Sequence, residues 1–286
     1  MPEEIKGLKV DDYQDLTYKL KMEKFQRYYL SFLLLIVYTN TIAQVNCNAV
    51  EGENCKKACE LYNWASDLQS FAESQEGFDK AIELCPDFSH AYMEKAVPYL
   101  KKGDFVTWKI LIDKAVALDP GMHPGYRGWT KFQFLRGYRS AIQNLEGLKK
   151  YKPEDLGRSQ NGDYNLDVVR AVSYTASGQK EKASGIIEKL LAARGYVKGM
   201  FDHYQLGVTY LELGRYDKAL ENFEKQSKGY DFAENTYFKS KVSKIRNKDY
   251  LDLNMLALQT YDEGKAMKAV CTHQFNKVYT QQVEVL

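Results

Sequence analysis

Five cysteines are the residues best able to do chemistry in this sequence, and four of them gather near its start: Cys47, Cys55, Cys59, Cys85 and, far away, Cys271. Thiols can form disulfides, bind zinc or stay reduced and packed. Cys55 and Cys59 are four residues apart, which places them on one face of a helix. An antiparallel second helix would bring Cys85 back to them, so we expect a disulfide from Cys85 to Cys59 or Cys55 in an oxidising compartment.

Other patterns for catalysis or ligand binding are weak. A zinc site would need a C-x-x-C motif, which is absent, and reduced thiols are expected if the chain is cytosolic. The histidines His90, His123, His203 and His273 are scattered without metal-ligand spacing. No G-x-S-x-G motif occurs, and "DEGKAMKAV" lacks the residues of a phosphate-binding loop. We therefore expect no active site, no metal and no cofactor.

The first 43 residues read as an extension and a secretory signal peptide. Basic residues precede an apolar run from Tyr28 to Tyr38, and Ala43 supplies a small residue before Gln44. The run is too short to cross a bilayer. We expect cleavage after Ala43, a true start at Met22 and a short leader over residues 44–56. A buried helix or an uncleaved anchor is the alternative, and the residue before Cys47 argues against a lipid anchor.

The overall charge of the chain does not indicate what kind of partner it binds. The 286 residues are 44% hydrophobic and 27% charged, and 40 Lys plus Arg stand against 38 Asp plus Glu. A net charge of +2 gives no reason to expect nucleic acid or a membrane surface as a partner. One basic stretch, "FKSKVSKIRNK" from Phe238 to Lys248, could dock a polyanion, but a solvated helix face is the favoured interpretation.

An internal repeat organises the rest of the chain. In "LGVTYLELGRYDKALENF", residues 206–223, small and aromatic residues stand at fixed places, and the same types occur 36 residues earlier. The matched pairs are Ala171 and Gly207, Tyr174 and Tyr210, Gly178 and Gly214, Ala183 and Ala219, and Ile187 and Phe223. Pro86, Pro120 and Pro153 recur at 34 and 33 residues. A period of 33 to 36 residues predicts a solenoid of helix pairs.

These residues resemble the tetratricopeptide repeat, which has the pattern Leu-Gly-x2-Tyr, a later Ala and Phe, and a closing Pro. The resemblance covers about five units over residues 57–227 and implies an all-α, right-handed solenoid of antiparallel helix pairs. Trp108, Pro98 and a residue lost near Gly137 depart from the pattern. We expect residues 228–286 to form a degenerate pair over 232–262 and a final capping helix over 265–282, or alternatively a separate interaction module.

Glycines have two expected roles in the pairs. Gly207 should allow two helices to approach closely, so leucine there should overpack while alanine should be mild. Gly103, Gly137, Gly178 and Gly214 should end the first helices with a positive φ, which glycine adopts easily.

The resemblance also implies a groove lined by the first helix of each pair. The expected lining is His90, Met93, Val97, Leu100, Lys101, Arg127, Lys131, Phe134, Val168, Val172, Thr175, Tyr204, Val208 and Leu211. Arg127 and Lys131 are expected to face the groove together and to have no structural duty. The carboxylate clamp of chaperone-binding relatives is missing, so the expected partner presents apolar side chains and an acidic residue.

The function indicated is an exported, non-catalytic scaffold that binds a protein or peptide in the cell envelope, in a Gram-negative periplasm. We expect no nucleic acid, no small-molecule substrate, and the membrane only as an export route. A sensory input domain of a signalling system is the second hypothesis, although no later apolar run of 18 residues follows. A helical-repeat enzyme is the third, and it would need carboxylates that the groove lining lacks.

Overall fold

The computed structural model describes residues 44–69, 71–268 and 274–286. The chain divides into two compact units, Met1–Glu51 and Gly52–Leu286. The described part of the first unit is a short stretch with one 3-10 helix, η2 (Cys47–Ala49). The expected signal peptide and its cleavage at Ala43 lie outside the described residues.

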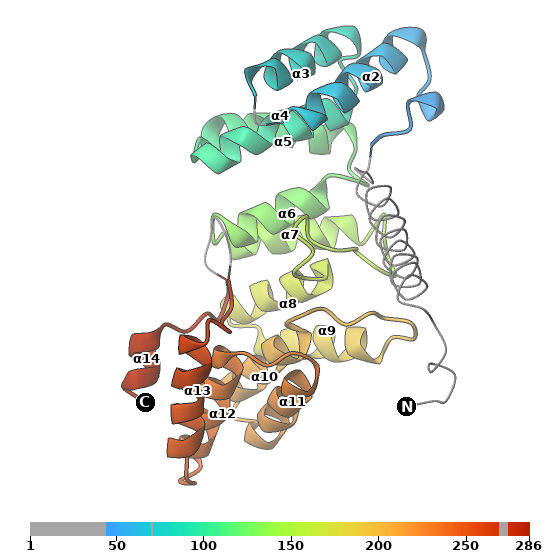
Figure 1. Cartoon of the computed structure of the whole chain (residues 1–286). Coiled ribbons are helices and arrows are strands. Elements are labelled where there is room, and N and C mark those ends of the chain that lie inside the picture. The colour runs from blue at the N-terminus through green and yellow to red at the C-terminus, as the bar shows by residue number, and fades with distance from the viewer. Residues whose placement is uncertain (1–43, 70, 269–273) are drawn as a thin grey trace, which may run out of the picture. The chain divides into compact units, whose positions relative to one another are not determined.

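The described residues of the second unit form thirteen α-helices joined by turns and loops, and they contain no β-strand (Figure 1). The helices are α2 (Glu53–Asp67), α3 (Ala72–Leu84), α4 (Ser89–Lys102), α5 (Phe105–Leu118), α6 (Pro124–Gln133), α7 (Tyr138–Leu148), α8 (Leu166–Ala176), α9 (Lys180–Ala192), α10 (Asp202–Glu212), α11 (Tyr216–Gly229), α12 (Ala233–Ile245), α13 (Leu251–Asp262) and α14 (Thr280–Glu284). The expected all-α class is confirmed.

Neighbouring helices form six consecutive pairs, from α2 with α3 to α12 with α13, and each pair contacts the next. This arrangement is a solenoid of helix pairs. The fifth pair ends at Gly229, the last residue of α11. The sixth pair, α12 with α13, lies in the region expected to hold a degenerate pair. Pro98 does not interrupt α4, which continues to Lys102.

The expected final helix over 265–282 is wrong. Among the residues described after α13, 265–268 and 274–279 are not helical, and Thr280–Glu284 form a short helix. Gly264 ends α13 with a φ of +73°. Much of the chain between α13 and α14 is held by side chains of other helices, as described below, which replaces the bonds that a helix would make within itself.

Close approach within a pair is seen directly at α10 and α11. A Cβ atom on Gly207 would lie 2.5 Å from Cε1 of Phe223, whose ring is fully buried. In the preceding pair Ala171 and Ile187 occupy the equivalent places and are also fully buried. The small residue on the first helix therefore accepts the large residue of the second, as the repeat pattern indicated.

Three first helices end at a glycine with positive φ, as expected: Gly103, Gly178 and Gly214. The expectation for Gly137 is wrong, because its φ is −81° and the left-handed residue is Arg136, with a φ of 51°. The residue missing from this unit shifts the turn by one position along the chain.

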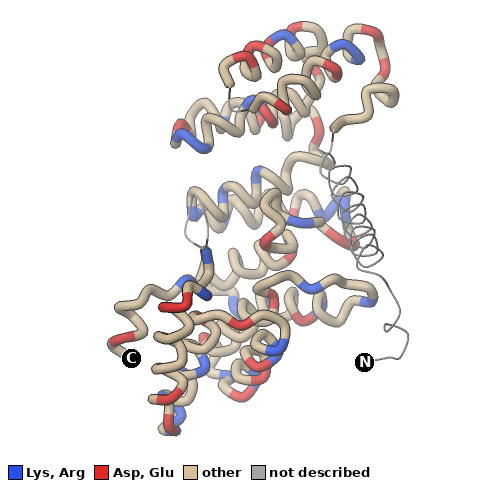
Figure 2. Tube along the Cα trace, viewed as in Figure 1, with Lys and Arg blue, Asp and Glu red and all other residues tan. Residues whose placement is uncertain are grey.

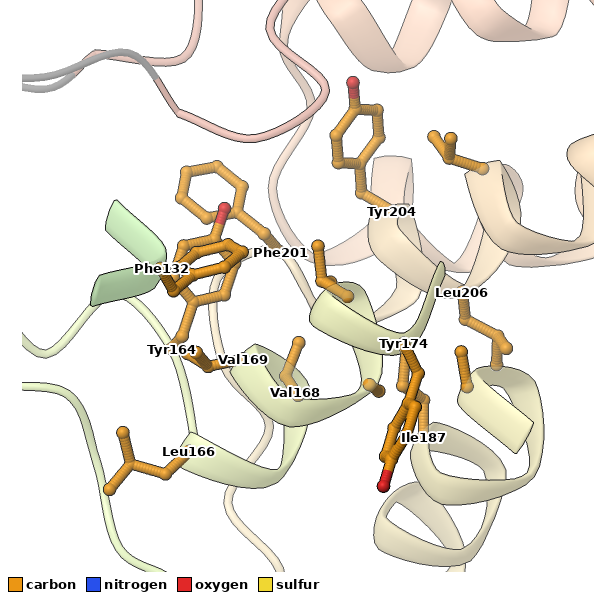
Figure 3. Packing of buried hydrophobic residues seen from close by; sticks show 14 of the residues in the cluster. Phe132, Tyr164, Leu166, Val168, Val169, Tyr174, Ile187, Phe201, Tyr204 and Leu206 are labelled. Carbon is orange, nitrogen blue, oxygen red and sulfur yellow. The ribbon is translucent and has the colours of Figure 1, made fainter. Parts of the chain in front are cut away.

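One large buried cluster runs from α6 to α12, and Figure 3 shows part of it around α8 and α10. A smaller cluster belongs to α4 and α5. Tyr126 and Phe134 pack against both clusters, so they join the second pair to the third.

The structure corrects the expectation that alanine at Gly207 would be mild, because even one methyl group would overlap the Phe223 ring. Gly207→Ala should lower the free energy of unfolding by about 1 to 3 kcal/mol. The matched control is Gly185→Ala on the exposed side of α9, where a Cβ would meet nothing within 4 Å. That variant should gain about 0.5 to 1 kcal/mol. Urea denaturation of both variants tests this, and equal midpoints would contradict the assigned contact.

Candidate peptide-binding surface

The expected groove lies on the face made by the first helices α4, α6, α8 and α10, called here the first-helix face. Part of its expected lining is buried in the core and cannot be open to a partner: Leu100, Val168, Val172, Thr175, Tyr204 and Val208. These placements correct the expectation. The physical reason is that α8 contacts both α6 and α10, so side chains assigned to the wall fill the space between these helices. Leu100 is instead buried between α4 and α5.

The remaining expected residues stay accessible. Lys101 is exposed, and the half-buried residues are His90, Met93, Val97, Arg127, Lys131, Phe134 and Leu211. All but Leu211 belong to α4, to α6 or to the residue that follows α6. The open part of the first-helix face is therefore concentrated on the second and third pairs.

Arg127 has a structural role that the sequence did not indicate. Its Nη1 atom donates to Oδ1 of Asp113 on α5 at 2.7 Å, and its Nε atom donates to Oδ1 of Asn144 on α7 at 2.6 Å. The side chain is 20% exposed. The expectation that Arg127 is free of structural duty is therefore wrong, because it ties the third pair to the second.

Lys131 differs from Arg127, since it makes no ion pair within the described part of the chain. Burial and the neighbouring Arg127 charge lower the pKa of Lys131. Of the two cations expected in the groove, Lys131 is therefore the one whose charged group is available to a partner.

A segment near the C-terminus crosses to the first helices and was not expected. Residues Gln274–Val278, called here the returning segment, lie between α13 and α14; Figure 1 shows this part of the chain leaving the last pair toward α7 and α8. The ring of Phe275 packs against Phe132 of α6 at 5.8 Å and Tyr138 of α7 at 5.7 Å between centroids.

Side chains of the solenoid also bind the backbone of the returning segment. The hydroxyl of Tyr204 donates to the carbonyl of Asn276 at 2.5 Å, and Nε2 of Gln205 donates to the carbonyl of Phe275 at 3.3 Å. Nδ2 of Asn276 donates to Oε1 of Gln205 at 2.7 Å. In Figure 3 the hydroxyl of Tyr204 points toward the side along which the pale red chain passes.

A buried carboxylate holds the end of this segment. Glu234 at the start of α12 is fully buried, and its Oε1 accepts from Nζ of Lys277 at 2.8 Å. Its oxygens also accept from the backbone amide of Met267. Burial lowers the pKa of Lys277, but hydrogen bonds to Glu234 and Tyr261 outweigh that effect and raise it. Lys277 therefore stays charged and pairs with Glu234.

These contacts could not be predicted from the sequence, because the residues of the returning segment show no helical spacing of apolar side chains. The usable signal was polar residues at buried positions of the first helices, Gln205 and Glu234, which need partners that helix packing does not supply.

Two histidines meet where the second pair joins the third. Nε2 of His123 lies 2.9 Å from Oγ of Ser89, and the rings of His90 and His123 pack edge to face at 5.4 Å. Burial, followed by the His90 charge, lowers the pKa of His123 to about 4, although Asp119 opposes this. Burial also lowers the pKa of His90. His90 thus joins the second pair to the third and is also one of the accessible residues of the expected lining.

The structure joins Cys55 to Cys85, with Cα atoms 5.0 Å apart, which is one of the two expected pairings. Cys47 and Cys59 are disulfide-bonded as well. Cys271 lies outside the described residues. In the part of the chain that the structure covers, no group of three or more His, Cys, Asp or Glu side chains could hold a metal ion.

Two adjoining cavities open beside α11, one facing α9 and α10 and the other facing residues 198–200 before α10. Their volumes are about 380 and 540 Å³, and Lys198, His203 and Lys225 line both. Within the described ranges, no helix has the length and apolarity required to span a membrane.

Residues 203–228, which form most of α10 and α11, match the family model of the tetratricopeptide repeat. No curated protein matches the sequence. Solved structures resemble the chain more broadly. PilF of Pseudomonas aeruginosa has a TM-score of 0.58 and 12% identity, over 80% of this chain and 98% of that one. PilW, a type IV pilus biogenesis factor, has a TM-score of 0.58 and 13% identity, over 82% of this chain and 100% of its own.

A tetratricopeptide repeat protein from Parabacteroides merdae has a TM-score of 0.52 and 13% identity, over 76% of this chain and 81% of its own. At these identities the likeness shows the fold alone. The chain therefore has the tetratricopeptide-repeat fold, and the resemblance drawn from its repeats is supported.

Stability should fall on acidification between about pH 6.5 and 4, because unfolded His123 binds a proton in that range that the folded state does not. One such proton changes the free energy of unfolding by up to about 1.4 kcal/mol per pH unit. His123→Asn, which can still bond Ser89, should flatten the profile. Thermal melting of both proteins from pH 7 to 4.5 tests this, and identical slopes would contradict it.

Proposed function

We propose that this chain is an exported, non-catalytic scaffold that binds a protein or peptide partner through the open part of its first-helix face. The observation that carries the proposal is the half-buried apolar surface of Met93, Val97 and Phe134 beside the cations Lys101 and Lys131. An apolar strip with charged edges suits a peptide that inserts side chains and pairs its own charges.

The fold supports the same class of function. Tetratricopeptide-type pairs present their first helices as a repeated surface, and such extended surfaces serve to bind other chains. PilW takes part in type IV pilus biogenesis, and that role is said of PilW alone. For this chain, the shared fold supports only the general proposal of a scaffold that binds other proteins.

Export is proposed on two grounds: the signal-like sequence before Gln44 and the disulfide between Cys55 and Cys85. Disulfides persist outside the reducing cytosol, in compartments such as the periplasm. The expected acidic residue of the partner would then face Lys131 in place of the paired Arg127.

Charge reversal at Lys131 should weaken partner binding without unfolding the protein. Lys131→Glu should reduce recovery of specific partners from an envelope extract about tenfold or more, because it repels an acidic partner residue. Lys189→Glu, an exposed charge on α9, is the control and should retain recovery. Equal recovery by both, or loss accompanied by a lower melting temperature, would argue against this surface.

Protein purified from its native host should begin at Gln44. Intact-mass measurement and N-terminal sequencing test this expectation directly. Retention of residues 22–43 in the mature form would contradict the proposed signal peptide.

A further inference from the structure

We propose that the returning segment is an internal ligand, and that its seat is a peptide site for a partner segment with an aromatic–Asn–basic pattern. The seat consists of Phe132, Tyr138, Tyr204, Gln205 and Glu234. This inference rests on the proposed function, since it names a chemistry that one partner would present. It also adds a site distinct from the open face of α4 and α6.

The polar residues of the seat are placed for a chain that crosses the helices. Gln205 and Glu234 are fully buried on α10 and α12, and Gln205 forms hydrogen bonds with Tyr164, Phe275 and Asn276. A buried polar group left without a partner costs about 1 to 3 kcal/mol. Helix packing alone would favour apolar residues at such positions. Their presence indicates a surface built to bind backbone and side-chain polar groups.

The seat recognises three successive positions in different ways. The first position packs an aromatic ring against both Phe132 and Tyr138, which also contact each other. The second is Asn276, which has a φ of 60° and bonds Gln205 through its side-chain amide. Asparagine tolerates this left-handed conformation better than most residues, so backbone shape and hydrogen bonding favour the same residue.

The third position requires a cation. Nζ of Lys277 meets Oε1 of Glu234 and the carbonyl of Met267, both at 2.8 Å. The Glu234 carboxylate is fully buried, and a buried charge is strongly unfavourable without an opposite charge. A neutral or acidic residue would leave it unpaired. The site therefore selects a basic partner segment, unlike the open face near Lys131.

Tethering explains how such a site could be regulated. An internal ligand competes at an effective concentration in the millimolar range, so an external peptide binds the intact chain weakly. Weakening the internal ligand should expose the seat and strengthen external binding. This reciprocal behaviour separates a ligand from a purely structural cap.

The test uses the full chain and a fluorescent synthetic peptide, QFNKVYT, with the sequence of residues 274–280. Phe275→Ala should bind this peptide at least about tenfold more tightly than the wild-type chain. A peptide with alanine for its phenylalanine, or glutamate for its lysine, should lose that gain. Equal affinity of the wild type and the variant, or indifference to the peptide sequence, would overturn the proposal.

A second variant guards against unfolding. Lys277→Ala removes the cation and leaves the aromatic contacts, and it should also bind the peptide more tightly than the wild type. Gln205→Ala added to either variant should abolish the gain, with helicity followed by circular dichroism. Failure of peptide binding while Lys131→Glu still abolishes partner recovery would overturn this inference and leave the proposed function standing. Peptide binding as expected, together with unchanged partner recovery by Lys131→Glu, would support this inference and overturn the proposed binding through the open first-helix face.

Discussion

Each helix pair in this chain has an apolar face that only the next pair can bury, and most of the structure follows from this constraint. It requires helices that approach closely, which Gly207 and Phe223 achieve within one pair. It also requires something beyond the last pair. There Val278 of the returning segment and Val283 of α14 pack with Tyr237 and Ala257, so the cap and the ligand-like segment are one continuous piece of chain.

Charged residues mainly hold the pairs together. Arg127 with Asp113 and Arg170 with Glu146 are ion pairs between helices of successive pairs. Figure 2 shows Lys and Arg distributed among Asp and Glu along the helices rather than gathered in one region. The basic stretch from Phe238 to Lys248 follows this pattern, because Lys239 and Arg246 bond Glu224 and Asp217 of α11. These two basic side chains are therefore paired with carboxylates of the same chain.

The fold could be predicted from the sequence because the helix pairs depend on residues that recur with one repeat length. Ala171 and Gly207 recur where helices must approach, and the pairs formed around them. The groove was predicted less well, since helical position alone does not say which neighbour a side chain meets. Val168 and Val172 became core when adjacent first helices packed together.

Contacts between distant, aperiodic segments were beyond such reasoning. Arg127 bonds Asp113 from another helix, and no spacing within α6 indicates that pairing. Asn276 and Lys277 belong to a stretch without regular alternation, whose seat exists only once several helices are stacked. Sequence periodicity therefore defined the scaffold, and long-range polar pairing defined what the scaffold holds.

The disulfide between Cys55 and Cys85 also changes how the chain would respond to mechanical force. The bond bridges a sequence separation of 30 residues, which enclose most of the first helix pair. An unfolded chain extends by about 3.3 to 3.6 Å per residue, so the bond withholds roughly 100 Å of extension from any load applied through the ends. The load passes through this covalent bond, so the residues between the two cysteines carry no tension. Only reduction would release that hidden length.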